Sequence, residues 1–179
     1  MKAPHAEGES GGLTIKQVKE TCPGVVKVIS LVNLDKKEVC KGGPKMYTRE
    51  EVYGEGLLLG EVLCKPVGHP DSEPYPSEEV VEQFLKEVDV EGLVVVHCAH
   101  GLNRTGYLIC RYLIQKCGVE PREAVARFNE ARGFPMRREI LLQHLYNRSW
   151  EKKGEIEQVR QDGKKDNSDE AMRQEERSD

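Results

Sequence analysis

The sequence predicts a single α/β domain in which helices flank a central sheet. Two apolar runs rich in β-branched residues, at 25–31 and 93–96, have the length and composition of buried strands. A series of helical patterns follows the second run, and strands followed by helices are typical of a layered α/β fold. The chain has 179 residues, which is enough for one domain with a hydrophobic core and too few for two.

The first half of the chain contains short predicted elements separated by loops. Thr14 and Gln17 form a capping-box pattern, which predicts the start of a short helix. The segment 33–56 is charged and interrupted by glycines, so we interpret it as a loop. We expect a strand at 57–65, followed by a loop at 66–76, where glycine and proline are frequent.

The second half is predicted to be mostly helical. Ser77 is expected to cap a helix whose apolar residues recur at helical spacing. After the strand at 93–96 we expect helices at 107–116, from Pro121 onward, and at 138–150.

The folded domain is expected to span residues 13–150. Residues 1–12 are polar and rich in glycine, so we expect a flexible N-terminus. Residues 151–179 are charged and have few apolar side chains, which predicts a disordered tail. No apolar run approaches the length of a membrane span, and no signal peptide precedes the six cysteines. We therefore expect an intracellular protein in a reducing compartment, not a disulfide framework.

The overall charge identifies no partner. The chain has 27 Lys and Arg against 31 Asp and Glu, a net charge of −4. Basic residues outnumber acidic ones from 104 to 148, while the tail is acidic. This distribution is compatible with an anionic substrate, but on charge alone an ordinary charged helix surface is the preferred interpretation.

The informative segment is 97–106, with the sequence His-Cys-Ala-His-Gly-Leu-Asn-Arg-Thr-Gly, between a predicted strand and a predicted helix. Backbone N–H groups and the helix dipole converge on an anion at such a junction. The same field lowers the pKa of a thiol, so we expect Cys98 to be a thiolate that attacks phosphorus at neutral pH. Arg104 can bind two phosphoryl oxygens with its planar guanidinium. The Thr105 hydroxyl can hydrogen-bond the sulfur and help it leave.

The main chain of this loop is expected to bind the phosphoryl oxygens. The residues concerned are Ala99, His100, Gly101, Leu102 and Asn103. Gly101 and Gly106 permit a tight backbone path. The alternative is a zinc site at His97, Cys98 and His100, but zinc needs four ligands and no second cluster at a suitable spacing is present in the sequence.

The segment 97–106 resembles the signature of the cysteine phosphatase superfamily, in which Cys, five residues, Arg and then Ser or Thr follow a His. Extended to Leu113, it is similar to the RNA 5′-triphosphatase branch of the dual-specificity phosphatase superfamily. This branch includes the triphosphatase domain of metazoan capping enzymes and the RNA/RNP-complex-interacting phosphatases. A looser resemblance covers 25–145.

The resemblance implies catalysis through a phosphocysteine intermediate, without a metal or a cofactor. It implies that Arg132 supports the loop and that Arg138 contacts substrate phosphate. His97 directly precedes the nucleophile, so we expect it to orient the loop by hydrogen bonding rather than to take up protons. Ala99 stands where the family usually has Thr, which removes a hydroxyl but no main-chain donor. The family also opens with a further segment before the helix at Thr14 that is lacking here, so we expect part of the substrate groove to be missing or built differently.

The identity of a general acid stays open at this stage. Hydrolysis of a phosphate ester needs an acid to protonate the leaving oxygen, and Asp71 is the aspartate of the loop at 66–76. The alternative is that Asp71 is only a turn residue. Release of a γ-phosphate needs little proton assistance, because the diphosphate end is a good leaving group. His100 and Asn103 either maintain the shape of the loop or contact the substrate.

We therefore expect a metal-independent RNA 5′-triphosphatase that removes the γ-phosphate, with removal of the β-phosphate left open. The alternatives are a dual-specificity protein phosphatase acting on phosphotyrosine, phosphoserine or phosphothreonine, and a catalytically weak module that binds RNA. The expected partners are an RNA 5′-end or a phosphoprotein, together with RNA/RNP proteins, and no membrane. We expect a nuclear rather than a cytoplasmic location.

Overall fold

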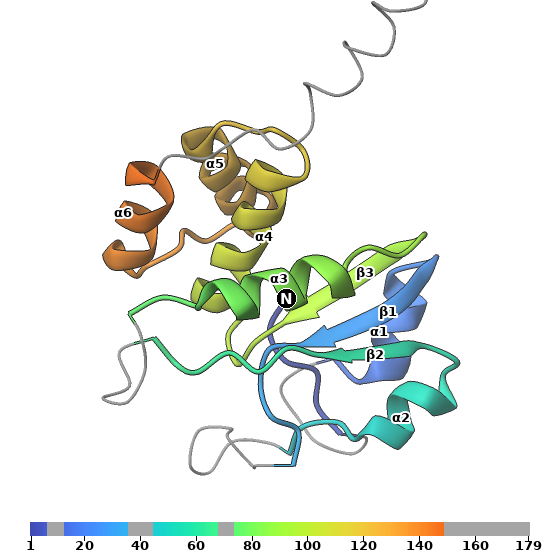
Figure 1. Ribbon diagram of the computed structural model, residues 1–179. Helices are drawn as coiled ribbons and strands as arrows, with labels where there is room; N and C mark the ends of the chain where they lie inside the picture. The colour runs from blue at the N-terminus through green and yellow to red at the C-terminus, as the bar shows by residue number, and fades with distance from the viewer. Residues whose placement is uncertain (7–12, 36–44, 68–73, 149–179) are drawn as a thin grey trace, which may run out of the picture. The chain divides into compact units, whose positions relative to one another are not determined.

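A three-stranded parallel sheet, in the order β2-β1-β3, is the centre of the fold. The computed structural model describes residues 1–6, 13–35, 45–67 and 74–148 (Figure 1). The strands are β1 (Val25–Ser30), β2 (Leu58–Glu61) and β3 (Leu93–His97). The helices of the described residues are α1 (Ile15–Thr21), α2 (Arg49–Gly54), α3 (Glu78–Glu87), α4 (Asn103–Gln115), α5 (Pro121–Arg132) and α6 (Glu139–Asn147). The predicted fold class, a central sheet flanked by helices, is confirmed.

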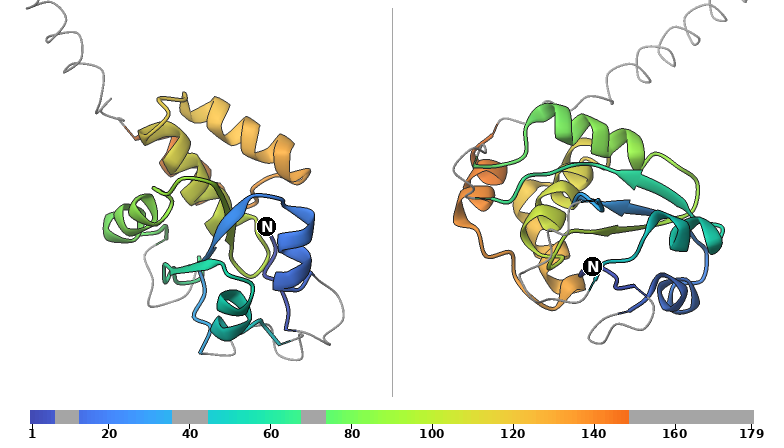
Figure 2. Two further views of the ribbon diagram at one scale, coloured as in Figure 1. Left: turned by 90° about the vertical axis from the view of Figure 1, so that its right-hand side faces the viewer. Right: turned by 90° about the horizontal axis from the view of Figure 1, so that it is seen from below.

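Helices cover both faces of the sheet. Figures 1 and 2 show α1 and α2 on one face and α3 and α4 on the other. The core beneath α1 and α2 contains Ile15, Val18, Val25, Val28, Tyr47, Val52, Leu57 and Val95. On the other face, Lys27 of β1 pairs with Glu87 of α3 at 2.6 Å. Gly60 of β2 leaves room for this pair, because a Cβ there would lie 2.6 Å from Glu87 Oε2.

Helix α2 corrects the prediction that the whole of 33–56 is a loop. Its N-cap is Thr48, whose side chain accepts a hydrogen bond from Glu51 N. The Glu51 carboxylate in turn accepts one from Thr48 N, at 2.5 Å. This capping box has the same form as the Thr14–Gln17 box of α1, so the sequence did contain the signal for the helix.

The first six residues correct the prediction of a flexible N-terminus at 1–12. Lys2 forms an isolated parallel bridge with Cys98, and the side chains of Ala3 and His5 are buried. The chain therefore begins alongside the loop that follows β3. The rest of 1–12 lies outside the described residues.

The observed boundaries differ in detail from the predicted ones. Helix α4 begins at Asn103 and not at 107, so the end of the informative segment forms its first turn. Strand β2 is shorter than the predicted strand at 57–65. The expected tail at 151–179 lies outside the described residues, and its disorder stays a prediction. No described helix has the length and apolar character needed to cross a bilayer.

Candidate active site

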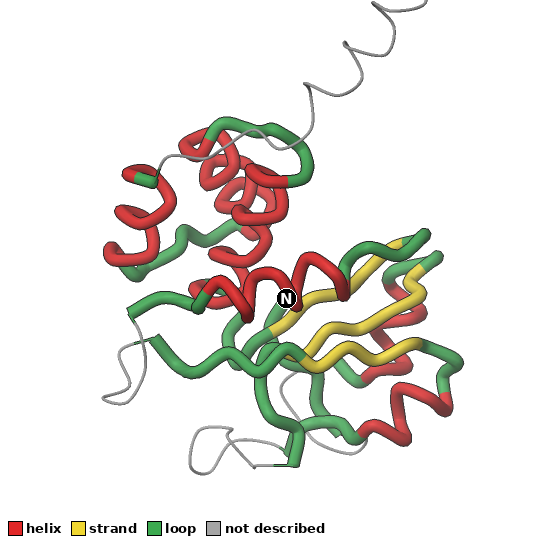
Figure 3. The backbone as a smooth tube through the Cα atoms, in the orientation of Figure 1, coloured by secondary structure: helices red, strands yellow, loops and turns green. Residues whose placement is uncertain are grey.

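The loop at 98–102, here called the phosphate loop, connects the end of β3 directly to the first turn of α4 (Figure 3). Gly101 has φ +64°, a conformation that favours glycine. A Cβ at Gly101 would also collide with the carbonyl group of Met1. The N-terminal segment therefore packs against the backbone of the phosphate loop, and only glycine allows this approach.

Cys98 is buried at the start of the phosphate loop. Burial is the largest influence on its pKa and would raise it. Hydrogen bonds from the Thr105 side chain and amide, the charge of Arg104 and a hydrogen bond from the His100 amide outweigh burial, so the pKa lies below that of an ordinary thiol. A thiol in these surroundings can supply a thiolate nucleophile.

Thr105 lies in the first turn of α4 and is almost completely buried. By distance and angle its hydroxyl forms no hydrogen bond with the described residues. It lies close enough to the Cys98 sulfur to help lower the pKa of that thiol. The role of Thr105 in stabilising the thiolate stays a prediction.

Arg104 is held by the carbonyl groups of two segments that follow strands. Its Nη1 donates to Cys64 O at 2.7 Å and to Leu31 O at 3.4 Å. In the described part of the chain its hydrogen bonds all come from Nη1, which leaves Nε and Nη2 for two phosphoryl oxygens. A guanidinium fixed in this way can bind a phosphoryl group bidentately.

His97 is fully buried and bonded through both ring nitrogens. Its Nε2 lies 2.6 Å from the Tyr47 hydroxyl, and its Nδ1 lies 3.4 Å from Cys98 O. Burial lowers the pKa of His97 to about 3, so the ring is neutral. A neutral ring satisfies both contacts if Nδ1 donates to Cys98 O and Nε2 accepts from Tyr47. His97 is therefore placed to orient the loop, not to transfer protons.

The same contacts leave His97 without a nitrogen for zinc. Within the described ranges, no group of three or more His, Cys, Asp and Glu side chains has the arrangement of a metal site. Asp71, the candidate general acid, lies outside the described residues, so its role stays a prediction.

Arg132, at the end of α5, lies against the phosphate loop. Its Nε donates to Gly101 O at 3.1 Å and its Nη2 to His100 O at 3.4 Å. These bonds fix two carbonyl groups of the phosphate loop. The position fits the supporting role that the family resemblance implies.

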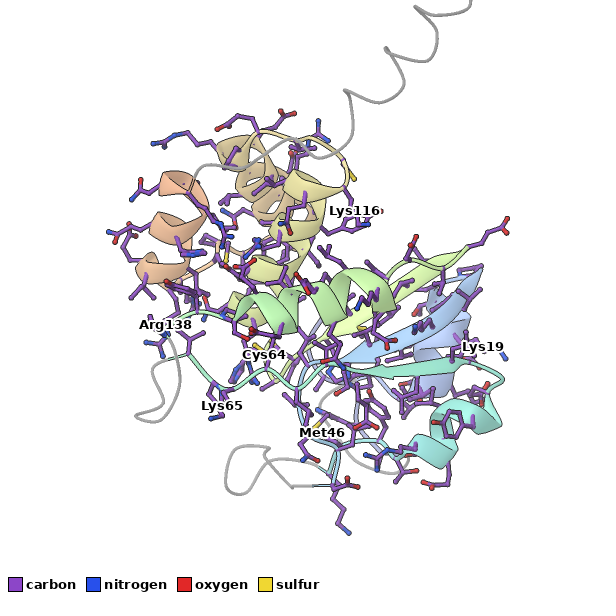
Figure 4. All side chains as sticks on the ribbon, in the orientation of Figure 1. Lys19, Met46, Cys64, Lys65, Lys116 and Arg138 are labelled. Atoms are coloured by element: carbon purple, nitrogen blue, oxygen red, sulfur yellow. The ribbon has the colours of Figure 1, made fainter. Side chains whose placement is uncertain are left out.

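Asn103 connects the phosphate loop to the segment before α6. Its Oδ1 accepts hydrogen bonds from Arg137 N at 2.9 Å and Arg138 N at 3.1 Å. Both arginine side chains are exposed, and Arg138 is the N-cap residue of α6. In Figure 4, Arg138 lies on the side of the domain that also carries Lys65. These bonds show that Asn103 holds the segment before α6 in place, while contact between Asn103 and the substrate stays a prediction.

Comparison with known proteins decides the family. The family described as "Dual specificity phosphatase, catalytic domain" matches residues 71–153. The tyrosine-protein phosphatase of Autographa californica nuclear polyhedrosis virus is 33% identical over 140 residues, which cover 74% of this chain and 73% of the viral protein. The chain belongs to the dual-specificity phosphatase family. It is a cysteine-dependent phosphatase.

Other relatives of this dual-specificity phosphatase carry names connected with RNA. The mouse RNA/RNP complex-1-interacting phosphatase is 41% identical over 129 residues, 69% of this chain and 40% of the relative. The zebrafish (Danio rerio) mRNA-capping enzyme is 34% identical over 110 residues, 58% of this chain and 18% of the enzyme. These matches confirm the resemblance to that branch, although the chain spans less than half the length of either protein.

Solved structures agree with the phosphatase fold. The active form of Tk-PTP has a TM-score of 0.53 at 22% identity, covering 76% of this chain and 88% of that one. A kinase associated phosphatase has a TM-score of 0.59 at 10% identity, covering 80% of each chain. At these identities the likeness concerns the fold alone.

Two contacts of the phosphatase site were missed by sequence reasoning. Tyr47, which binds His97, lies in a segment interpreted as loop, and no pattern in the sequence pairs these residues. The packing of the N-terminal residues against Gly101 was also missed, because the polar composition of 1–12 indicates a flexible segment. The glycines that follow Ala6 dominate that composition.

Proposed function

We propose that this phosphatase removes the γ-phosphate from the 5′-triphosphate end of RNA, with Cys98 as the nucleophile. The observation that carries the proposal is the pair of hydrogen bonds from Arg137 and Arg138 to Asn103. They bring two adjacent, exposed arginines to the first residue of α4, next to the phosphate loop. A triphosphate end has further anionic phosphate groups beside the one in the loop. The two arginines at this position can pair with those groups.

The proposed reaction proceeds in two steps. The Cys98 thiolate attacks the γ-phosphorus, the bond to the bridging oxygen breaks, and the RNA leaves with a diphosphate end. Water then attacks the phosphocysteine, which releases orthophosphate and restores the thiolate. Arg104 binds the phosphoryl oxygens in both steps, and the Thr105 hydroxyl stabilises the departing sulfur.

The phosphate loop by itself does not select a triphosphate, because its amides and Arg104 accept any terminal phosphoryl group. Selectivity has to come from contacts outside the loop. A charge-assisted hydrogen bond contributes about 1.5–3 kcal/mol when it is largely desolvated and less at an exposed rim. A single such contact from Arg137 or Arg138 corresponds to a preference of roughly ten-fold to 150-fold.

A second candidate function is the dephosphorylation of proteins. The name of the viral relative, a tyrosine-protein phosphatase that matches over 73% of its length, favours this alternative. A phosphoprotein substrate has a poorer leaving group and would require an acid, for which Asp71 is the candidate.

The two functions predict different substrate preferences. Without added metal, we expect kcat/KM for phosphate release from triphosphate-ended RNA to exceed that for a phosphotyrosine peptide by at least about ten-fold. Arg138→Ala should narrow the difference, because it removes a contact that only the triphosphate uses. Arg127→Ala, an exposed arginine of α5, is the matched control, and Cys98→Ser should be inactive toward both substrates.

The opposite pattern would support the protein phosphatase. Equal or reversed preference in the wild-type chain, together with a large loss of peptide hydrolysis in Asp71→Asn, would contradict the RNA proposal. Association with RNA/RNP proteins and a nuclear location are further predictions of the RNA proposal, and imaging of the tagged protein checks the second.

A further inference from the structure

The segment at 133–138, here called the rim segment, lacks regular secondary structure but is held at several points. Arg132 precedes it and is bound to the phosphate loop. Within it, Met136 is buried, and its amide donates to Asn129 Oδ1 at 3.0 Å. The amides that bind Asn103 complete the attachment at the other end. The backbone of the rim segment is therefore fixed relative to the phosphate loop.

Phe134 is the aromatic residue of the rim segment, and 56% of its surface is exposed. A single exposed apolar side chain is common and by itself indicates nothing. Phe134 also lies beside an arginine that is bound to the phosphate loop. The Arg132 guanidinium carbon lies 5.8 Å from the centre of its ring, and the same guanidinium binds the loop carbonyl groups of Gly101 and His100.

Three properties of a ligand follow from this arrangement. It has a flat surface to pack on the exposed ring of Phe134, it carries negative charge to meet the arginines of the rim segment, and it is continuous with a phosphoryl group in the loop. A 5′-nucleotide of RNA has all three. In a phosphoprotein, the phosphorylated side chain has no aromatic ring or, in phosphotyrosine, has one that is attached directly to the phosphate in the loop.

We propose that Phe134 is a stacking platform for the first nucleobase of the RNA substrate. The inference rests on the proposed RNA 5′-triphosphatase activity and adds a base-binding subsite to it. Stacking of a base on an aromatic side chain tolerates every base, so the subsite distinguishes RNA ends from other polyphosphates without reading sequence. Loss of the Phe134 ring should lower kcat/KM for triphosphate-ended RNA by about five-fold to about 150-fold.

The test compares a substrate that has a base with one that has none. We would measure kcat and KM of the full chain for triphosphate-ended RNA and for inorganic tripolyphosphate. Phe134→Ala should lower kcat/KM for RNA within the stated range, mainly through KM, and leave tripolyphosphate within about two-fold. Phe134→Trp should retain the RNA activity. Tyr53→Ala, which removes another exposed aromatic side chain, should change neither substrate.

The outcomes separate the subsite from the proposed function. If the wild-type chain hydrolyses triphosphate-ended RNA and Phe134→Ala loses nothing, or loses equally on tripolyphosphate, the stacking subsite is wrong while the activity stands. If the wild-type chain does not act on triphosphate ends, both are wrong. A selective loss by Phe134→Ala on a phosphotyrosine peptide would assign the rim segment to protein substrates and overturn the inference.

Discussion

The reactivity of Cys98 depends on a balance between burial and hydrogen bonding. Burial alone would leave a neutral, inert thiol, as it does for Cys110, whose pKa burial raises to about 12. Both cysteines are buried, but only Cys98 has the Thr105 hydroxyl, two amides and Arg104 around its sulfur. The difference between them is therefore in the polar surroundings.

Thr105→Val tests this balance at a single atom, since valine replaces the hydroxyl by a methyl group of similar size. Without the hydroxyl the pKa of Cys98 should rise. The thiolate is the reactive form, so the acidic limb of the kcat/KM profile should move to higher pH. The rate of alkylation by iodoacetamide against pH measures the same titration directly. Thr105→Ser restores a hydroxyl and should restore the profile. A profile that is unchanged in Thr105→Val would show that the hydroxyl does not lower the pKa of Cys98.

Among individual residues, those of the phosphate loop could be predicted from the sequence, because they form a local pattern. The spacing of Cys98 and Arg104 indicated a phosphate loop, because the loop chemistry lies within a few neighbouring residues. The hydroxyl partner of His97 comes from Tyr47, fifty residues away. Such a contact depends on how distant segments pack, and spacing in the sequence does not reveal it.

Helix α4 supports the site through its packing against α5. Gly106 was expected to permit a tight loop, but it lies within α4 and faces Phe128 of α5. A Cβ at Gly106 would lie 2.6 Å from Phe128 Cε1. The glycine therefore allows two helices to approach closely. This matters for the site because α5 also carries Arg132 at its end.

We expect Gly106→Ala to destabilise the fold by about 1–3 kcal/mol, since the added methyl group overpacks the α4–α5 contact. Urea unfolding at neutral pH measures the change. Gly54→Ala in α2 is the control. Apart from its chain neighbours and its own helix backbone, no atom of the described residues lies within 4 Å of the added Cβ, and alanine in a helix should stabilise slightly. If Gly106→Ala leaves the free energy of unfolding unchanged, α4 and α5 can move apart at little energetic cost.

Whole elements were predicted where hydrophobic periodicity was strong and missed where it was weak. The strand at 93–96 and the helix after Ser77 follow from apolar patterns. Helix α2 is short and half of its residues are charged, so only its capping box indicated it, and the glycines around it favoured a loop. The length of β2 was overestimated. Beyond Glu61 the amides of Val62 and Cys64 still bond to Ser30 O and Leu31 O, at 2.9 and 3.3 Å, but this pairing does not extend the regular strand.

Across the whole domain, His97 connects parts that are distant in sequence. It ends β3, supports the phosphate loop through Cys98 O, and binds Tyr47, which precedes α2. Tyr47 and His97 are both nearly inaccessible to water. Protonation of His97 would place a charge in this interior and oppose the contact with Tyr47. The state of one buried ring should therefore affect the stability of the whole fold.

This coupling predicts that acid weakens the fold through His97. The pKa is about 3 in the folded chain against 6.5 without burial. Between these values the unfolded chain binds the proton and the folded chain does not, so the free energy of unfolding falls as the pH drops below 6.5. The contribution lost between pH 6.5 and about pH 5 is about 2 kcal/mol.

Urea unfolding at a series of pH values, for the wild type and for His97→Asn, measures this contribution. Asparagine can hydrogen-bond to Tyr47 and does not titrate, so the variant should show a smaller loss of stability across the same range. The difference in slope should approach one proton, about 1.4 kcal/mol per pH unit, because a single buried ring is responsible. Identical slopes in the two proteins would mean that His97 takes up its proton in the folded state as readily as in the unfolded chain.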